Sequence, residues 1–203
     1  MNLLMHELIS SISQIVLFVI IPFIWWFLTQ RTQVAFHTWI GLKPVKKENR
    51  KGAIKNSVII LILFCILSII LLFSLKGIET ATSEFHGKGI LALPVVFVYA
   101  IFNTSFPEEL LFRGFLLKRL SNKFGFEIGN IIQSLLFGVI HGIIFFSVAG
   151  GIKTIIVTLF TGAVGYLMGY INEKKSNGSI LPSWIIHGLA NLFSSTIVLF
   201  SLI

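Results

Sequence analysis

Long apolar stretches follow one another along this 203-residue chain, and short polar segments separate them. A transmembrane helix needs about 20 apolar residues to cross the hydrocarbon layer of a bilayer. The pattern therefore predicts an all-α fold, a polytopic transmembrane helical bundle of about six spans. The predicted spans are Ser11–Leu28, Asn56–Leu75, Gly89–Phe106, Ile128–Ala149, Thr154–Ile171 and Ile180–Leu202.

The run from Pro107 to Leu120 follows the third span directly and is rich in charge. It can extend that span, or it can form a short interfacial or re-entrant helix at 107–120. Proline is well tolerated in the first turn of a helix, so Pro107 is well placed to start a new one. The sequence leaves both alternatives open.

The composition is that of an integral membrane protein. Hydrophobic residues make up 55% of the chain and charged residues 12%, whereas soluble domains contain about 25% charged residues. The first apolar segment lacks a basic start and a small-residue cleavage site, so it is predicted to be a retained span.

Lysine and arginine are distributed unevenly between the predicted spans. The N-terminal tail and the C-terminal end contain none. The five loops contain, in chain order, seven, two, four, one and two of them. The two in the second loop are Lys76 and Lys88, which Glu79 and Glu84 offset. This alternation obeys the positive-inside rule if both termini are extracytoplasmic. It also accounts for the net charge of +8, so we expect no nucleic-acid partner.

Glycines recur at helical spacing in two of the spans. Gly138 and Gly142 lie in the fourth span, and Gly162, Gly165 and Gly169 lie in the fifth. Small residues four apart allow membrane helices to approach closely, so these positions predict helix packing and no chemistry.

Two adjacent glutamates, Glu108 and Glu109, interrupt the apolar sequence at the end of the third span. A charge at membrane depth costs at least ~2.5 kcal/mol, which makes such a residue a functional candidate. Glu109 and Arg113 are four apart and can pair on a helix, either to fix packing or to take part in chemistry. Glu108 has no such partner, and a free carboxylate suits a general base.

Two of the five histidines lie inside predicted spans, His141 in the fourth and His187 in the sixth. Asn191 follows His187 by four residues, so both side chains lie on one helix face. Together with Glu108, these residues can deprotonate a water molecule and stabilise an oxyanion without any cofactor. A zinc site made of Glu108, His141 and His187 is the alternative.

Several other chemistries are excluded. The chain has no aspartate and no His-Glu-x-x-His helix, and the single cysteine, Cys65, cannot form an internal disulfide or a cysteine-based metal site. Ser183 precedes His187 by four residues, but neither Ser183 nor Ser134 lies in a glycine-flanked nucleophile setting. A serine-based site is therefore disfavoured.

Three short motifs occur in order along the second half of the chain. They are Glu108-Glu109-x-x-x-Arg113, Phe137-x-x-x-His141 and His187-x-x-x-Asn191. Over about residues 90–203 this pattern resembles the CPBP family, which includes the CAAX prenyl endopeptidases and the bacteriocin-processing, Abi-type intramembrane proteases. The family is often labelled metalloprotease, although water activation by a glutamate without metal is the better-supported view of it.

The resemblance implies a role for each motif residue. Glu108 matches the general base that acts on water, and His141 matches the histidine that helps to activate it. His187 and Asn191 match the pair that stabilises the oxyanion. The other two positions, those of Glu109 and Arg113, are thought to shape the site.

The resemblance also implies a function. We expect an intramembrane endopeptidase that cleaves a membrane-associated or lipid-modified peptide, for peptide maturation or self-immunity. Its partners would be membrane lipid and that peptide substrate. The alternatives are acyl transfer on lipoproteins, a non-proteolytic scaffold or immunity protein, and a proton-coupled carrier. The carrier would show internal repeats, and we find none.

The chain is expected to divide at residue 88. Residues 1–88 would supply two transmembrane helices with a basic cytoplasmic loop, and residues 89–203 the CPBP-like catalytic core. The protein would lie in a bacterial cytoplasmic membrane, with Glu108 at the cytoplasmic end of the third span and a site open to the cytoplasm. His141 is expected about three turns deep, which requires a tilted or late-starting fourth helix, or a glutamate helix that dips inward.

Overall fold

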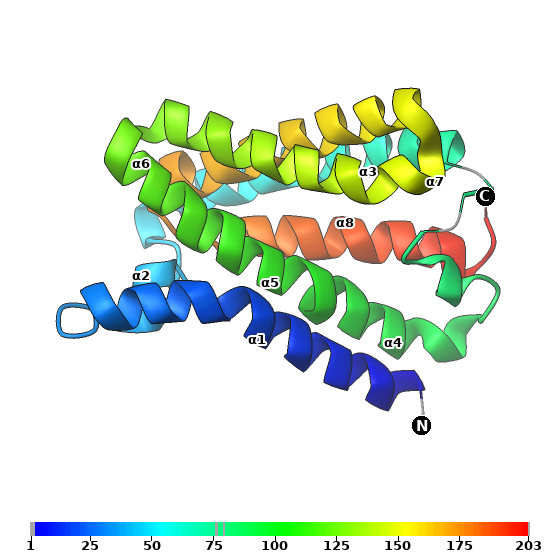
Figure 1. Cartoon of the computed structure of the whole chain (residues 1–203), viewed down its shortest axis with the longest axis horizontal. Coiled ribbons are helices and arrows are strands. Elements are labelled where there is room, and N and C mark those ends of the chain that lie inside the picture. The colour runs from blue at the N-terminus through cyan, green and yellow to red at the C-terminus, as the bar shows by residue number, and fades with distance from the viewer. Residues whose placement is uncertain (1–2, 76, 79, 203) are drawn as a thin grey trace.

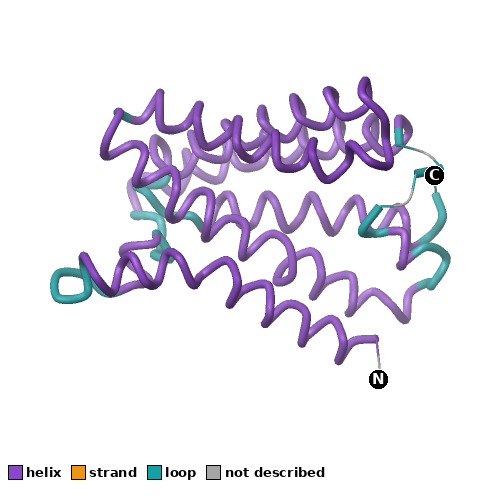
Figure 2. Tube along the Cα trace, viewed as in Figure 1, coloured by secondary structure: helices purple, strands orange, loops and turns teal. Residues whose placement is uncertain are grey.

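The structure is a computed structural model that describes residues 3–75, 77–78 and 80–202. The described part of the chain consists of helices and loops without any strand, which confirms the all-α prediction (Figure 2). The loops gather at the two ends of the bundle. Lys76 and Glu79, which entered the charge pattern of the second loop, lie outside the described residues.

The first part of the chain contains α1 (Leu3–Thr29), the short α2 (Phe36–Ile40) and α3 (Arg50–Ser74). A long irregular helix follows, made of α4 (Leu93–Val98), the π-helical η4 (Tyr99–Ser105), α5 (Phe106–Glu109), the π-helical η5 (Leu110–Leu117) and α6 (Lys118–Phe124). The last part contains α7 (Phe126–Tyr170), the π-helical η6 (Ile171–Lys175) and α8 (Leu181–Leu199). Single 3₁₀ turns are η1 (Lys47–Asn49), η2 (Ser83–Phe85) and η3 (Ile90–Ala92).

Five helices in the described residues are long and apolar enough to cross a membrane. They are Leu3–Thr29, Lys47–Ser74, Ile90–Phe124, Phe126–Val148 and Gly150–Lys175. The last two are the halves of α7 with η6, because the backbone leaves the helical conformation at Gly150 with φ 75°. The chain is therefore a multi-pass membrane protein, as predicted.

The predicted sixth span forms α8, which is not among these five helices. Its 19 residues carry His187, Asn191 and three serines, and they would extend about 28 Å. The helix lies in the middle of the bundle, where α3 and α7 cover one side and α4 and α5 the other (Figure 1). Protein rather than lipid therefore surrounds much of α8, which is why its sequence is less apolar.

Both termini lie at the same end of the bundle, together with the sharp bend of α7 (Figure 1). The opposite end holds α2, the turn between α6 and α7, and the turn before α8. The loops with high and low counts of basic residues thus lie at opposite ends of the bundle.

The end predicted for the third span is wrong. The segment 107–120 does not form a separate helix but continues the span, which runs from Ile90 to Phe124. Pro107 does lie in the first turn of α5. The preceding turn is π-helical, with the Phe106 amide bonded to the Ile101 carbonyl five residues back. This wider turn removes the clash that a proline makes inside a regular α-helix, so the helix continues.

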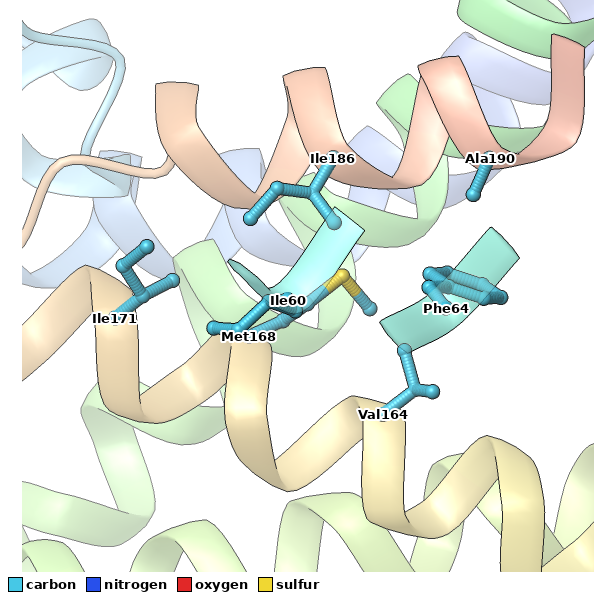
Figure 3. Packing of buried hydrophobic residues seen from close by; sticks show 7 residues of the cluster. All are labelled: Ile60, Phe64, Val164, Met168, Ile171, Ile186 and Ala190. Atoms are coloured by element: carbon cyan, nitrogen blue, oxygen red, sulfur yellow. The ribbon is translucent and has the colours of Figure 1, made fainter. Parts of the chain in front are cut away.

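An apolar cluster joins α3, the second half of α7 and α8 (Figure 3). Its buried members are Ile60, Phe64, Val164, Met168, Ile171, Ile186 and Ala190. Ile186 and Ala190 flank His187 in the sequence of α8. The cluster therefore fixes the rotation of α8 about its axis and turns His187 towards the site.

The glycines allow the two halves of α7 to pack backbone against backbone, as predicted. A Cβ atom on Gly138 would overlap the Thr158 carbonyl oxygen and lie 3.0 Å from the Gly162 nitrogen. One turn later, a Cβ on Gly142 would overlap the Thr158 hydroxyl. Since His141 lies between these two glycines, their close contacts determine its position.

Replacement of Gly138 by alanine should push the two halves of α7 apart. We expect Gly138→Ala to destabilise the protein by about 1–3 kcal/mol, as overpacking typically does. Gly52→Ala is the matched control, because a Cβ there would meet nothing within 4 Å. Thermal unfolding in detergent, followed by tryptophan fluorescence, measures the difference. Equal unfolding temperatures for the two variants would contradict this account of the packing.

Candidate active site

The three sequence motifs meet near the middle of the bundle. Glu108 and His141 lie nearly the same number of residues before and after the turn at Gly125, each about 25 Å along its helix. Because α5 and α7 belong to an antiparallel hairpin, the two side chains reach the same depth. Glu108 is therefore near the middle of its span, and the expected position at the span's end is wrong.

Both imidazoles face the same oxygen of Glu108. The distance from Glu108 Oε2 is 3.8 Å to His187 Nε2 and 3.9 Å to His141 Nε2. These distances are longer than a direct hydrogen bond. They suit polar contact between the imidazoles and the carboxylate through one water-sized molecule. The side chains of Glu108 and His141 are 20% and 24% exposed, whereas Glu108 Oε2 itself is buried and makes no hydrogen bond within the protein.

The other nitrogen of each imidazole is already bound. His141 Nδ1 lies 2.8 Å from the Phe137 carbonyl oxygen, and His187 Nδ1 lies 3.0 Å from Glu109 Oε1. A carbonyl or carboxylate oxygen only accepts, so Nδ1 carries the hydrogen in both rings. The Nε2 atom of a neutral ring then offers a lone pair towards Glu108, and a protonated ring offers a hydrogen.

Glu109 and Arg113 form the predicted ion pair. Arg113 Nη1 donates to Glu109 Oε1 over 2.8 Å, and neither side chain is exposed to any extent. The Arg113 guanidinium also lies 4.2 Å above the ring of Phe137, which in turn packs against His141. With His187 as its second partner, Glu109 connects the first and third motifs inside the protein. Its side chain has no solvent exposure.

Asn191 lies one turn beyond His187 and is held by the neighbouring π-helix. Its amide donates to the Thr104 hydroxyl over 2.9 Å, and it makes a weaker contact of 3.4 Å to the Ser105 hydroxyl. Both hydroxyls donate a hydrogen bond to the Ala100 carbonyl oxygen. Thr104 and Ser105 were not predicted from the sequence, where only their position just before the glutamates could have indicated them.

Glu7, a buried acidic residue in α1, was not predicted from the sequence. The Asn103 amide of η4 donates to its carboxylate and also contacts Ser10. The predicted first span began at Ser11 and excluded Glu7, whereas the span in the structure begins at Leu3 and includes it. Its contact holds α1 against the π-helical segment that carries Thr104.

The predicted zinc alternative does not fit this arrangement. Among the described residues, no group of three or more histidine, cysteine or acidic side chains could hold a metal ion. This includes Glu108, His141 and His187, although the three converge. We therefore derive no chemical step through a metal.

Removal of the Arg113 guanidinium should strongly destabilise the protein. Arg113→Ala would leave Glu109 buried with His187 alone, and breaking a buried ion pair typically costs about 3–5 kcal/mol. Lys51→Ala removes an exposed charge from α3 and should change stability little. Thermal unfolding of both variants in the same detergent tests this. Similar unfolding temperatures would show that the pair contributes nothing to stability.

A known protein family matches the part of the chain that carries this site. The family profile described as "Type II CAAX prenyl endopeptidase Rce1-like" matches residues 90–193, which is slightly more than half of the chain. The matched segment contains Glu108, His141, His187 and Asn191. No curated protein and no solved structure shows a significant match. The protein thus belongs to the Rce1-like family of type II CAAX prenyl endopeptidases.

Proposed function

We propose that this protein is an intramembrane endopeptidase that hydrolyses a peptide bond in a membrane-associated or lipid-modified peptide. Family membership supports a protease in general. The observation that carries the proposal is the convergence of two imidazole Nε2 atoms, 3.8 and 3.9 Å away, on one oxygen of Glu108. A water molecule between these groups would contact a base and two orienting partners at once.

The reaction would begin with proton transfer from that water to Glu108. His141 Nε2 accepts a hydrogen bond from the remaining hydrogen of the water. This bond orients the water oxygen towards the carbonyl carbon of the substrate. The new C–O bond converts the carbonyl oxygen into an oxyanion. A protonated His187 and the amide of Asn191 then donate to the oxyanion. Glu108 returns its proton to the amine as the C–N bond breaks.

The Asn191 amide has a hydrogen available for this role. One of its two hydrogens makes the 2.9 Å bond to Thr104, whereas its contact to Ser105 is 3.4 Å long. The long contact is easily exchanged for an oxyanion. The bond to Thr104 meanwhile keeps the amide in place.

The orientation in the membrane belongs to the same proposal. The alternation of basic residues supports extracytoplasmic termini in a bacterial cytoplasmic membrane, with a site reached from the cytoplasmic side. The site lies near the middle of long apolar helices, so a substrate has to be membrane-associated to reach it. Peptide maturation or self-immunity is the biological role that suits such a substrate.

Loss of the Glu108 carboxylate should abolish cleavage. Purified wild type and Glu108→Gln are incubated in detergent with a membrane-peptide library, and products are read by mass spectrometry. We expect a rate lower by about 10²–10⁴-fold, the usual contribution of general acid–base catalysis. His141→Ala should behave alike, and Glu48→Gln, at an exposed position, should remain active. Full activity of folded Glu108→Gln would refute the proposal.

Chelators should leave cleavage unchanged. The proposed reaction uses only the side chains of Glu108, the two histidines and Asn191, so EDTA or phenanthroline at millimolar concentration should not alter the wild-type rate. The same peptide assay measures it. Activity that disappears with chelator and returns with added zinc would make the protein a metalloenzyme instead.

A further inference from the structure

A second set of buried polar residues lies beside the site and outside the three motifs. Asn172 in η6 and Ser183 in α8 are both fully buried. The Asn172 amide donates to the Ser183 hydroxyl over 2.7 Å, and the Ser183 backbone amide donates to Asn172 Oδ1 over 3.3 Å. Both polar atoms of the Asn172 side chain are thus bound to a single residue.

Ser183 connects Asn172 to the site. It precedes His187 by one helical turn, so the two side chains lie on the same face of α8. Its hydroxyl donates to the Ile180 carbonyl over 3.0 Å and accepts the Asn172 amide over 2.7 Å, so both hydrogen bonds of this hydroxyl hold the first turn of α8. Asn172 therefore anchors, through Ser183, the turn of α8 that directly precedes His187, whose Nδ1 is bound in turn to Glu109.

The turn between Asn172 and Ser183 is itself tightly anchored. The Gly178 amide donates to the Asn172 carbonyl over 2.8 Å, and the Ile180 amide donates to the Gly41 carbonyl over 2.9 Å. The Lys118 ammonium binds Glu173 at 2.7 Å and the Gly178 carbonyl at 2.9 Å. These bonds hold the turn, and Asn172 with it, against the loop that precedes α3 and against α6.

We propose that Asn172 and Ser183 are positioning residues for His187. They hold the first turn of α8 so that the imidazole keeps Nδ1 on Glu109 and Nε2 towards Glu108. The role in the reaction rests on the proposed peptidase function, whereas the role in fixing the imidazole does not. A displacement of about 1 Å at a catalytic group can cost about 10²-fold in rate, so loss of either side chain should be measurable.

The test compares Asn172→Ala and Ser183→Ala with Asn130→Ala. Asn130 is also a fully buried amide, and it bridges the halves of α7 through a 2.9 Å bond to the Tyr166 carbonyl. The control therefore removes an equivalent buried side chain whose hydrogen bonds in the described structure stay within α7 and do not reach α8. All three variants are purified in detergent as the full chain.

The first measurement is hydrogen–deuterium exchange at the Cε1 carbon of each histidine, read by mass spectrometry. This exchange depends on the protonation and surroundings of the individual imidazole and requires no substrate. We expect Asn172→Ala and Ser183→Ala to change the His187 rate at least twofold while the rate of His141 stays the same. Asn130→Ala should change neither rate.

The second measurement is peptide cleavage. The two positioning variants should lower kcat at least tenfold with KM within twofold of wild type, and Asn130→Ala should keep kcat within threefold. If Asn172→Ala is not recovered folded, Ser183→Ala carries the test, because it removes one hydroxyl and leaves the backbone bonds of α8 intact.

The outcomes separate the two proposals. An unchanged His187 exchange rate, or an equal change in Asn130→Ala, would overturn the positioning role whatever the activity. A changed rate in a protein whose wild type cleaves no peptide would support the positioning role and count against the peptidase function. A changed rate together with the selective loss of kcat would support both.

Discussion

The charged group formed by Glu109, Arg113 and His187 is the interaction on which the centre of this protein depends. A carboxylate and a guanidinium with no exposure lie between membrane-spanning helices, where an unpaired charge would be very costly. The pair is stable only while α5 and η5 keep their place beside α7 and α8. Phe137 under the guanidinium and His187 on the carboxylate complete the group.

The two adjacent glutamates can have different roles because neighbouring residues of a helix point about 100° apart. Glu109 turns into the bundle, where its partners fix it. Glu108 turns towards the two imidazole Nε2 atoms and stays partly exposed. One short sequence therefore supplies both a support for the site and its candidate base. The π-helical turns before and after α5 allow this, since they fit Pro107 into a continuous helix.

The all-α, multi-pass character of the chain followed from the sequence, while several boundaries did not. The apolar stretches predicted the first two spans and both halves of α7, because burial in lipid demands long apolar helices. The third span was expected to end at Phe106, with 107–120 as either its extension or a separate short helix. Here Glu109 and Arg113 neutralise each other and the π-turn accommodates Pro107, so the helix continues to Phe124.

By itself, the sequence determined that the chain crosses a membrane repeatedly, and it singled out the motif residues Glu108, His141, His187 and Asn191. Only the tertiary structure decided their common depth, the direction of each imidazole nitrogen and the partners of Asn191. The same holds for Thr104 and Asn172, whose polar side chains carry no recognisable spacing, and for the hydrogen-bond partners of Ser183. The periodicity and charge of a segment indicate which of its residues face lipid and which face water. The hydrogen bonds that fix a site depend on distances between helices, which no single segment contains.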